Sequence, residues 1–326
     1  MDVEGTGGDA RLVVRERPLP TITPDDILVR VHAAGVNRAD LLQRQGLYPP
    51  PKGASDIIGL ELAGEVVDVG AEVRRFREGD KVCAILAGGG YSEYCAVPQW
   101  QAAPCVEGLS WQENAVVPEV WCTVWSMIMD RGGLQPHESL LVHGGSGGIG
   151  CAAIQLGGLY GKRVFATARG QEKRAYCEAL GGSDTLRVID YGDEDFVAVI
   201  KDETEGRGVD VILDMVGGDY VVRNLKCLAK DGRLLYIGFL QGSKVSVDLL
   251  PLMLRRQSIS GATLRVQPPR FKGALMAALE RSLWPLLAEG RVKPCLQATY
   301  ALEDAQRAHD HMESGASMGK IALLCS

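Results

Sequence analysis

Residues 139–150 read SLLVHGGSGGIG, a short apolar run that passes directly into a glycine-rich loop. Gly145, Gly147 and Gly150 have the spacing GxGxxG, and the run before them has the length of a buried strand. Glycines after a strand let the backbone approach a phosphate closely, and a following helix offers free N–H groups and a partial positive charge. A glycine-rich turn without a ligand is the alternative, but the strand-loop-helix context favours a phosphate-binding loop.

Strand-like and helix-like segments alternate on the C-terminal side of this loop. Four apolar runs have the length and composition of strands, at residues 139–143, 163–168, 209–214 and 233–238. Segments of helical period lie between them, such as 171–180 and 220–228. This alternation predicts an α/β fold with a parallel, doubly wound sheet whose strands are buried on both faces.

The regions on either side of this segment have a different, β-rich character. Asp26–Ala33 alternates apolar and polar residues, and Gly59–Val69 is a second strand region with glycines at its bends. The last third resumes this character, and its expected elements are a helix at 271–289, a strand at 295–301, a helix at 302–313 and a strand at 321–324. We therefore expect a nucleotide-binding domain at 119–262, inserted into a substrate domain that consists of residues 1–118 and 263–326.

Composition and charge exclude several classes of function. The chain has 326 residues, a formal net charge of −6 and 46% hydrophobic residues, which is typical of a globular protein. It contains no basic run of the kind that binds nucleic acid and no apolar stretch long enough to span a membrane. The nine cysteines are scattered without a CxxC pair, so we expect free thiols and a reducing, cytoplasmic location.

The end of the second strand bears on the choice of dinucleotide. Enzymes that use NAD usually place an Asp or Glu there, where it binds the ribose hydroxyls. Here the strand end continues into Arg169 and Gly170, Lys173 follows, and Glu172 lies inside the next helix. Because basic groups bind a 2′-phosphate by charge-assisted hydrogen bonds, we expect NADPH. The alternative is that these cations are only solvated residues at the start of a helix.

The histidines give no metal-binding pattern. None of the five forms a ligand pair with a cysteine, and His309 and His311 are two residues apart on an expected helix. These two do not share a helix face and are expected to be solvated. A catalytic zinc needs Cys, His or carboxylate ligands around an open position. We therefore expect no metal, which argues against Lewis-acid activation of an alcohol.

Four segments carry a resemblance to a known family. They are NRADLLQRQGLY at 37–48, GLELAG at 59–64, PEVWCT at 118–123 and the C-terminal stretch 315–323. They resemble the zinc-free quinone oxidoreductases of the medium-chain dehydrogenase/reductase superfamily, of the zeta-crystallin-like and p53-inducible type. Leu60 stands where zinc-dependent relatives carry a His, and Asn37 lies in the segment where they carry a Cys ligand. The likeness covers nearly the whole chain.

The resemblance implies a GroES-like β-rich barrel domain, a Rossmann domain with a doubly wound parallel sheet, NADPH as cofactor and a homodimer. It places Tyr48 and Asn37 at the substrate-cleft positions as the catalytic residues. It also implies a set of cofactor contacts: Thr123, Ser146, Gly147, Gly148, Ile149, Arg169, Gly170, Lys173, Tyr191, Gly238, Phe239, Leu240, Ser317, Gly319 and Lys320. Four features depart from the family: Gly170 replaces a usual Ser, Arg169 beside it a usual Gly, Ser317 a usual Asn, and the first strand is absent or altered before Gly7.

The function implied by the resemblance is NADPH-dependent reduction of quinones or other electrophilic carbonyl compounds by hydride transfer without zinc. Tyr48 would hydrogen-bond the substrate carbonyl, or only cap the cleft, and Asn37 would position substrate or satisfy a turn. Glu61 is expected to be a buried, structural carboxylate. Reduction of enoyl-thioester or alkenal double bonds, with a Tyr as proton donor, stays open as the alternative. RNA binding, which occurs among related proteins, finds no support in the charge pattern.

The expected homodimer has a candidate seam. Val245–Leu264 resembles the last Rossmann strand and the segment before it, which puts Ser258–Ala262 at a sheet edge. An open edge favours pairing with a second copy about a two-fold axis. Arg255, Arg256 and Arg265 are expected to flank that seam. The alternative is an edge covered by the chain's own C-terminal helix.

Overall fold

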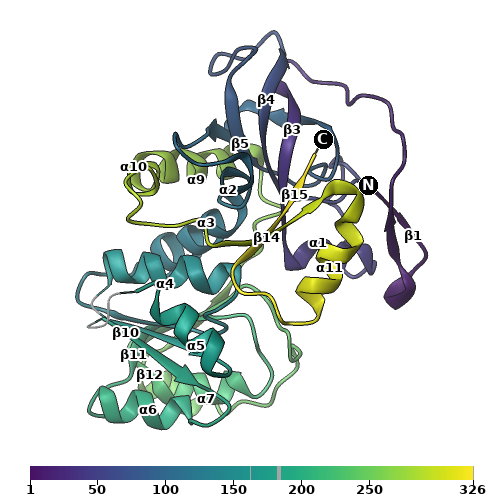
Figure 1. Ribbon diagram of the computed structural model, residues 1–326. Helices are drawn as coiled ribbons and strands as arrows, with labels where there is room; N and C mark the ends of the chain where they lie inside the picture. The colour runs from purple at the N-terminus through teal and green to yellow at the C-terminus, as the bar shows by residue number, and fades with distance from the viewer. Residues whose placement is uncertain (162, 182–184, 326) are drawn as a thin grey trace. The chain divides into compact units, whose positions relative to one another are not determined.

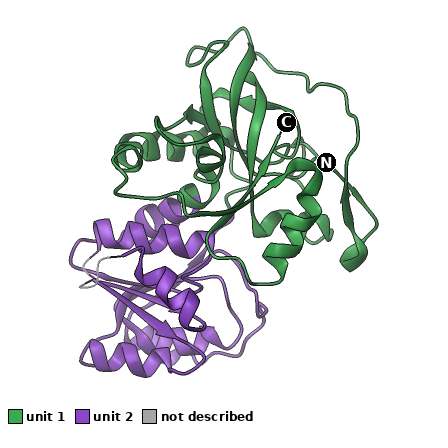
Figure 2. Cartoon of the chain, viewed as in Figure 1, with its two compact units in different colours: residues 1–122, 264–326 green, residues 123–263 purple. Residues whose placement is uncertain are grey.

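The computed structural model describes residues 1–161, 163–181 and 185–325. The chain divides into two compact units (Figure 2). Unit 1 consists of residues 1–122 and 264–326, and unit 2 of residues 123–263. These units are close in extent to the domains expected from the sequence, whose assignment as substrate and cofactor domains stays a prediction.

Unit 2 contains a six-stranded parallel sheet in the order β10-β9-β8-β11-β12-β13 (Figure 1). Its strands are β8 (Ser139–Val142), β9 (Arg163–Ala168), β10 (Leu186–Asp190), β11 (Val209–Asp214), β12 (Leu228–Tyr236) and β13 (Ser258–Gly261). Its helices are α4 (Gly148–Tyr160), α5 (Gln171–Glu178), α6 (Phe196–Glu203), α7 (Tyr220–Cys227) and α8 (Leu250–Leu254). A π-helical segment lies at Trp125–Arg131. The expected doubly wound parallel sheet is confirmed. Every residue of β8 and β11 is buried, as strands covered on both faces must be.

Two strands differ from the sequence expectation. β10 was not predicted, because its five residues have only a weak strand signal between turn-rich segments. β12 begins at Leu228 instead of the expected residue 233, because its first residues pair with Val209 before the register shifts. Asp231, with a φ of 63°, lies at this irregularity, so the sequence there reads as a turn.

Gly157 explains an oddity of helix α4, which carries two consecutive glycines. A Cβ at Gly157 would lie 2.7 Å from Cγ2 of Val164 and 2.8 Å from Cδ2 of Leu140. Only glycine therefore lets α4 pack this closely on β8 and β9, and the packing offsets the low helix propensity of glycine. A Cβ at Gly158 would meet nothing within 4 Å, and the structure gives no reason for glycine there.

Unit 1 is built on a seven-stranded sheet in the order β14-β15-β3-β4-β5-β7, with β6 paired to β3. The strands are β3 (Asp26–Val36), β4 (Glu61–Val69), β5 (Lys81–Ile85), β6 (Tyr94–Pro98), β7 (Ala102–Pro104), β14 (Leu296–Ala301) and β15 (Lys320–Leu324). All pairs are antiparallel except β14 with β15. The C-terminal strand β15 lies between β14 and β3, so the first and last parts of the sequence form one sheet (Figure 1).

The helices of unit 1 cover this sheet. They are α1 (Arg38–Arg44), α2 (Trp111–Ala115), α3 (Pro118–Val124, which runs into unit 2), α9 (Pro269–Ser282), α10 (Trp284–Ala288) and α11 (Ala305–Glu313), with short 3₁₀ turns at Gly7–Asp9, Gln99–Gln101 and Leu302–Asp304. The single helix expected at 271–289 is wrong, because Leu283 interrupts it and Pro285 opens α10. Proline lacks the N–H that a continuous helix needs.

The N-terminal segment forms a small hairpin sheet of its own. β1 (Asp2–Glu4) pairs antiparallel with β2 (Arg11–Val13). A strand before Gly7 is therefore present, although it has only three residues. Among the described residues, no helix combines the length and apolar character needed to cross a lipid bilayer.

Candidate active site

The glycine-rich loop joins β8 to α4, as the sequence predicts. Gly144 has a φ of 69°, a conformation that favours glycine. A Cβ at Gly150 would lie 2.2 Å from the carbonyl oxygen of Gly144, so this turn tolerates no larger residue there. Helix α4 has Gly147 as its N-cap and begins at Gly148, so no side chain stands in front of its first N–H groups.

These features fit a bound dinucleotide phosphate. Ser146 is buried, and Gly147, Gly148 and Ile149 are half-buried. The loop contains no carboxylate that would repel a phosphate, and α4 has 13 residues whose dipole adds a partial positive charge at its start. Behind the loop, buried His143 is held by Asn224 (Nε2 to Oδ1, 2.7 Å). The loop is therefore supported from the core of unit 2.

The expected adenosine-side residues follow β9. Arg169 is exposed, and among the described residues no carboxylate forms an ion pair with its guanidinium. Lys173 is half-buried on α5, and Gly170, with a φ of 82°, is the N-cap of that helix. A Cβ at Gly170 would meet nothing within 4 Å, so its surroundings are open. Tyr191, at the end of β10, is 43% exposed.

The structure adds one acidic residue to this group that the sequence analysis missed. Asp190 ends β10, and its Oδ2 accepts a hydrogen bond of 2.9 Å from the N–H of Gly170. Its Oδ1 accepts another, of 3.0 Å, from the N–H of Gly192. The sequence signal for the dinucleotide lies at the end of the second strand, β9, and β10 itself was not expected. Both carboxylate oxygens are thus occupied by backbone donors of neighbouring loops.

The other predicted cofactor contacts lie in two places. In unit 2, Thr123 and Gly238 are half-buried, and Phe239 and Leu240 are exposed after β12. The loops after β8, β9 and β12 lie at one edge of the sheet because parallel strands end on the same side. In unit 1, the remaining three are half-buried Ser317, buried Gly319 and buried Lys320. All of these roles stay predictions.

Lys320 has its ammonium group inside unit 1. Its Nζ donates to the carbonyl oxygen of Val36 (3.0 Å), to Oδ1 of Asn37 (2.5 Å) and to Oε1 of Glu61 (2.7 Å). The side chains of Lys320 and Glu61 are 3% and 0% exposed. An ammonium has three donors, and these partners engage all of them. A cofactor contact through Nζ would therefore require one of these bonds to break.

Asn37 belongs to the same buried network. Its Nδ2 donates to Oε1 of Glu61 (2.9 Å), and its backbone N–H donates to Oδ2 of Asp40 (2.7 Å) in the first turn of α1. The second oxygen of Glu61 accepts from the N–H of Glu119 (2.9 Å). The expected burial and hydrogen bonding of Glu61 are confirmed. Asn37 is 6% exposed and bonded at both ends of its amide, so its catalytic role stays a prediction.

A second part of the network runs from Asp40 to His309. The hydroxyl of Tyr91 donates to Oδ2 of Asp40 (3.1 Å) and lies 3.1 Å from Nε2 of His309. Burial raises the pKa of Asp40 to about 7 and lowers the pKa of His309 to about 3. The expectation that His309 is solvated is wrong, because the buried face of α11 includes it. His311 is half-buried, with its Nδ1 3.0 Å from the hydroxyl of Tyr300.

Tyr48 is half-buried in the loop after α1, and Arg265 fixes that loop. Burial raises the pKa of the Tyr48 phenol, so the hydroxyl is protonated at neutral pH. Arg265 donates to the carbonyl oxygen of Tyr48 (3.0 Å), to that of Ala87 (2.8 Å) and to Oε1 of Gln43 (2.6 Å). Its guanidinium also lies 5.2 Å from the centre of the Tyr48 ring. Arg265 thus holds Tyr48 by its backbone carbonyl and its ring, and none of these contacts engages the Tyr48 hydroxyl.

A zinc ion does not fit the side chains at this site. Within the described ranges, no three His, Cys, Asp or Glu side chains gather in a way that could hold a metal. Leu60 is buried and apolar, and Asn37 and Glu61 are bonded to the Lys320 ammonium. The cation that Glu61 holds is therefore this ammonium. Catalysis without zinc stays a prediction.

The opposite pKa shifts of Asp40 and His309 predict how stability depends on pH. Between about pH 4 and 7 folded Asp40 holds a proton that the unfolded chain releases, so this group alone makes stability fall as pH rises. Between about pH 3 and 6.5 folded His309 lacks a proton that the unfolded chain binds, so this group alone makes stability rise with pH. The two contributions oppose each other in wild type.

Single substitutions should expose each contribution. With Asp40→Asn, the free energy of unfolding should rise with pH between about 4 and 6.5, by up to about 1.4 kcal/mol per pH unit. With His309→Gln it should fall over the same interval. Urea unfolding at pH 4.5, 5.5 and 6.5 measures both slopes against wild type. The same slope in both variants would contradict the assignment.

Comparison with known proteins gives matches along most of the chain. Residues 23–125 match the alcohol dehydrogenase GroES-like domain, and residues 148–281 match the family described as zinc-binding dehydrogenase. Quinone oxidoreductase of Rattus norvegicus is 30% identical over 312 residues, which are 94% of this chain and 91% of that protein. Highly-reducing polyketide synthase 1 of Aureobasidium melanogenum is 30% identical over 97% of this chain, but the chain spans only 14% of that protein.

A solved structure shows the same fold. Escherichia coli quinone oxidoreductase complexed with NADPH superimposes with a TM-score of 0.84 and 29% sequence identity, over 99% of this chain and 98% of that one. The mixed sheet of unit 1 and the parallel sheet of unit 2 are therefore a GroES-like and a Rossmann-like fold. The chain belongs to the quinone oxidoreductase-like family of the medium-chain dehydrogenase/reductase superfamily.

Proposed function

We propose that the protein reduces quinones with NADPH, by hydride transfer and without zinc, in the cytoplasm. The observation that carries this proposal is the loop Gly144–Gly150, which leaves the start of α4 open to a phosphate. The similarity to two quinone oxidoreductases, one of them complexed with NADPH, supports the choice of substrate and cofactor.

In this proposal the cofactor supplies the hydride and the chain holds the reactants. The glycine loop binds the pyrophosphate through backbone N–H groups, and Arg169 with Lys173 binds the 2′-phosphate. The Tyr48 hydroxyl donates a hydrogen bond to a carbonyl oxygen of the acceptor, because its raised pKa keeps it protonated. Quinones accept hydride readily, so positioning is the main contribution of the protein.

The alternative is reduction of an enoyl thioester or alkenal. Tyr48 favours it in one respect, because a half-buried, protonated phenol is also suited to give a proton to carbon. The similarity to a polyketide synthase named as highly reducing supports it too. The Tyr48 hydroxyl has a different role in each function. It donates an accessory hydrogen bond in quinone reduction and an obligatory proton in reduction of an enoyl thioester or alkenal.

Substitution of Tyr48 by Phe separates the two functions. The change removes the hydroxyl and keeps the ring under Arg265. If the hydroxyl only orients a quinone, a hydrogen bond worth roughly 0.5–1.5 kcal/mol is lost, and the rate falls about tenfold at most. If it is an obligatory acid, the loss is on the order of 100- to 10,000-fold. NADPH oxidation with a quinone and with crotonyl-CoA measures both losses.

Tyr300→Phe, at another half-buried tyrosine of unit 1, is the matched control and should leave both rates within about twofold of wild type. A loss above a hundredfold with the quinone would contradict the accessory role. Strong wild-type activity with crotonyl-CoA, and a large loss there alone, would move the function to the alternative.

The preference for NADPH can be tested on one helix. Lys173→Ala should weaken NADPH binding by about 1.5–3 kcal/mol and leave NADH nearly unchanged, because only NADPH carries the 2′-phosphate. Arg174→Ala is the control on the same helix, because the Arg174 guanidinium pairs with Glu178 at 2.9 Å. Isothermal titration with both dinucleotides gives the four affinities. Equal binding of NADPH and NADH by wild type would overturn the preference.

We also infer a homodimer through the edge of the unit 2 sheet. β13 is the last strand in the sheet order, and Ile259 on it is 42% exposed. Next to it in the sequence, α8 and the residue before it expose four large apolar side chains: Leu249, Leu250, Met253 and Leu254. An apolar helix face and an open strand edge are features that a second copy can cover. Arg265, which the sequence also placed beside this seam, has its guanidinium bonded to groups of unit 1.

Light scattering tests the dimer directly. In dilute solution the measured mass should be twice the chain mass of 35.1 kDa. Met253→Glu should lower it toward the monomer, because a charge in an apolar seam is costly to bury. Val14→Glu, at another exposed apolar residue, serves as the control and should leave the mass unchanged. A monomeric wild type would contradict the proposal.

A further inference from the structure

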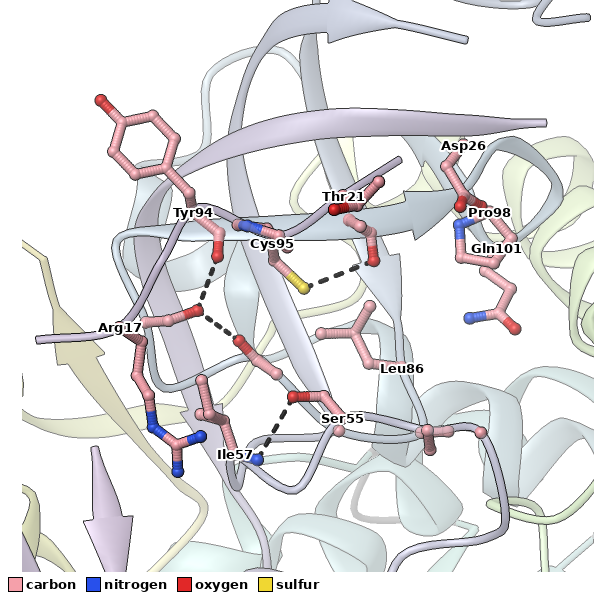
Figure 3. Close-up of a pocket in the computed structure, with 18 of the residues that line it drawn as sticks. Arg17, Thr21, Asp26, Ser55, Ile57, Leu86, Tyr94, Cys95, Pro98 and Gln101 are labelled. Atoms are coloured by element: carbon pink, nitrogen blue, oxygen red, sulfur yellow. Dashed lines mark hydrogen bonds between the residues drawn. The ribbon is translucent and has the colours of Figure 1, made fainter. Parts of the chain in front are cut away.

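Unit 1 contains a groove of about 1120 Å³ whose wall is formed by this unit alone. Figure 3 shows Arg17 and Tyr94 at one end, Gln101 at the other, and Leu86 and Cys95 between them. Its remaining wall comes from Met1, Asp26 and the segments 14–23, 51–57, 86–89, 92–98, 265–272 and 302–303. The segment 265–272 matters most, because it places two buried cations on the groove.

Lys272 is the first of these cations. It lies on α9, whose buried residues are Lys272, Leu275, Met276 and Leu279, the spacing of a core-facing helix stripe. Lys272 is only 2% exposed and lines the groove, and within residues 1–161, 163–181 and 185–325 no hydrogen bond or ion pair of its ammonium is found. A largely buried ammonium without a partner is costly, and a Met of similar length would fill the same place at lower cost.

Arg265 is the second cation on the groove and is 5% exposed. Its three hydrogen bonds go to the carbonyl oxygens of Tyr48 and Ala87 and to the Gln43 amide oxygen, so every partner is neutral. A guanidinium has five N–H donors, of which these contacts use three. None of these three hydrogen bonds is to a carboxylate, and the acidic group that acts on the Arg265 charge is buried Asp40, which is not one of its hydrogen-bond partners.

The charge of Arg265 acts on Lys272. Burial, and next the charge of Arg265, lower the pKa of Lys272 to about 8, and no carboxylate is among the groups that affect it. Acidic residues on the groove lie elsewhere: Glu16, Asp26, Glu93 and Glu303. Asp26 already accepts a hydrogen bond from the N–H of Thr23 (2.9 Å). Arg17 differs from the two cations, because Asp2 and Asp56 pair with it.

We propose that Lys272 and Arg265 bind an oxyanion substituent of the electron acceptor in this groove. An oxyanion would give Lys272 the partner it lacks and would balance both charges at once. Arg265 also holds the backbone of Tyr48, so the anion would be bound beside the residue assigned to the acceptor carbonyl. The inference rests on the proposed reduction of an electrophilic acceptor and restricts that acceptor to acidic compounds. The anion is either a carboxylate or sulfonate on a ring, or the phosphates of a thioester carrier.

Binding without cofactor tests this site apart from turnover. Isothermal titration compares a charged with an uncharged ligand in two pairs. The first pair is anthraquinone-2-sulfonate, which is charged, and 2-hydroxymethylanthraquinone. The second pair is crotonyl-CoA, which is charged, and the N-acetylcysteamine thioester of crotonate. In Lys272→Met, affinity for the charged member of at least one pair should fall at least tenfold, and affinity for the uncharged member should stay within twofold. Loss confined to the sulfonate identifies a ring substituent, and loss confined to crotonyl-CoA identifies a carrier phosphate.

Lys52→Met is the matched control, because Lys52 is an exposed lysine on the same groove. It should leave all four affinities within twofold of wild type. Lys272→Met should keep or raise the thermal unfolding midpoint, which shows that any loss of binding is not a loss of fold. Unchanged affinity of Lys272→Met for both anions, or an equal loss in Lys52→Met, overturns the site. Failure to oxidise NADPH with any quinone would refute the proposed function instead, and the binding result would stand.

Discussion

The buried contact between Lys320 and Glu61 is the interaction on which unit 1 depends. It joins β15, near the end of the sequence, to β4, and through Asn37 and Val36 it also holds the junction of β3 and α1. A buried ion pair adds little net stability, because both groups lose their hydration, but removal of one partner leaves an uncompensated charge. The backbone is fitted to this pair, since a Cβ at Gly35 would lie 2.1 Å from Oε1 of Glu61. The pair therefore specifies which strands and helices meet.

Unit 2 follows a simpler constraint. All its strands are parallel, so the loops that follow them lie at one edge, and the glycine loop supplies backbone donors where side chains would obstruct a ligand. Unit 1 holds fixed polar groups instead, through the contacts of Arg265 with the Tyr48 loop.

Sequence reasoning succeeded where a local pattern decides the structure. The apolar run and glycine spacing at 139–150 predicted the strand, loop and helix because the local pattern is enough to mark them, although β8 pairs with the distant β11. It failed where partners are distant in sequence. His309 looks like a surface residue until Tyr91 is known to lie beside it, and Arg265 gives no sign that it bonds to Gln43. Strand β10 was missed because five residues carry too little pattern to outweigh neighbouring turns.

The position of Lys320 also sets an order of events during synthesis. Unit 2 is one continuous segment, so every residue it needs has been made once Thr263 has been added. Unit 1 is interrupted, and its sheet lacks β15 until Lys320–Leu324 have been made. Until then Glu61 has no ammonium to pair with, and its carboxylate is more stable in water than in a closed core. The nascent chain should therefore carry a complete unit 2 for some time while the sheet of unit 1 still has open strand edges, a stage at which aggregation is favoured.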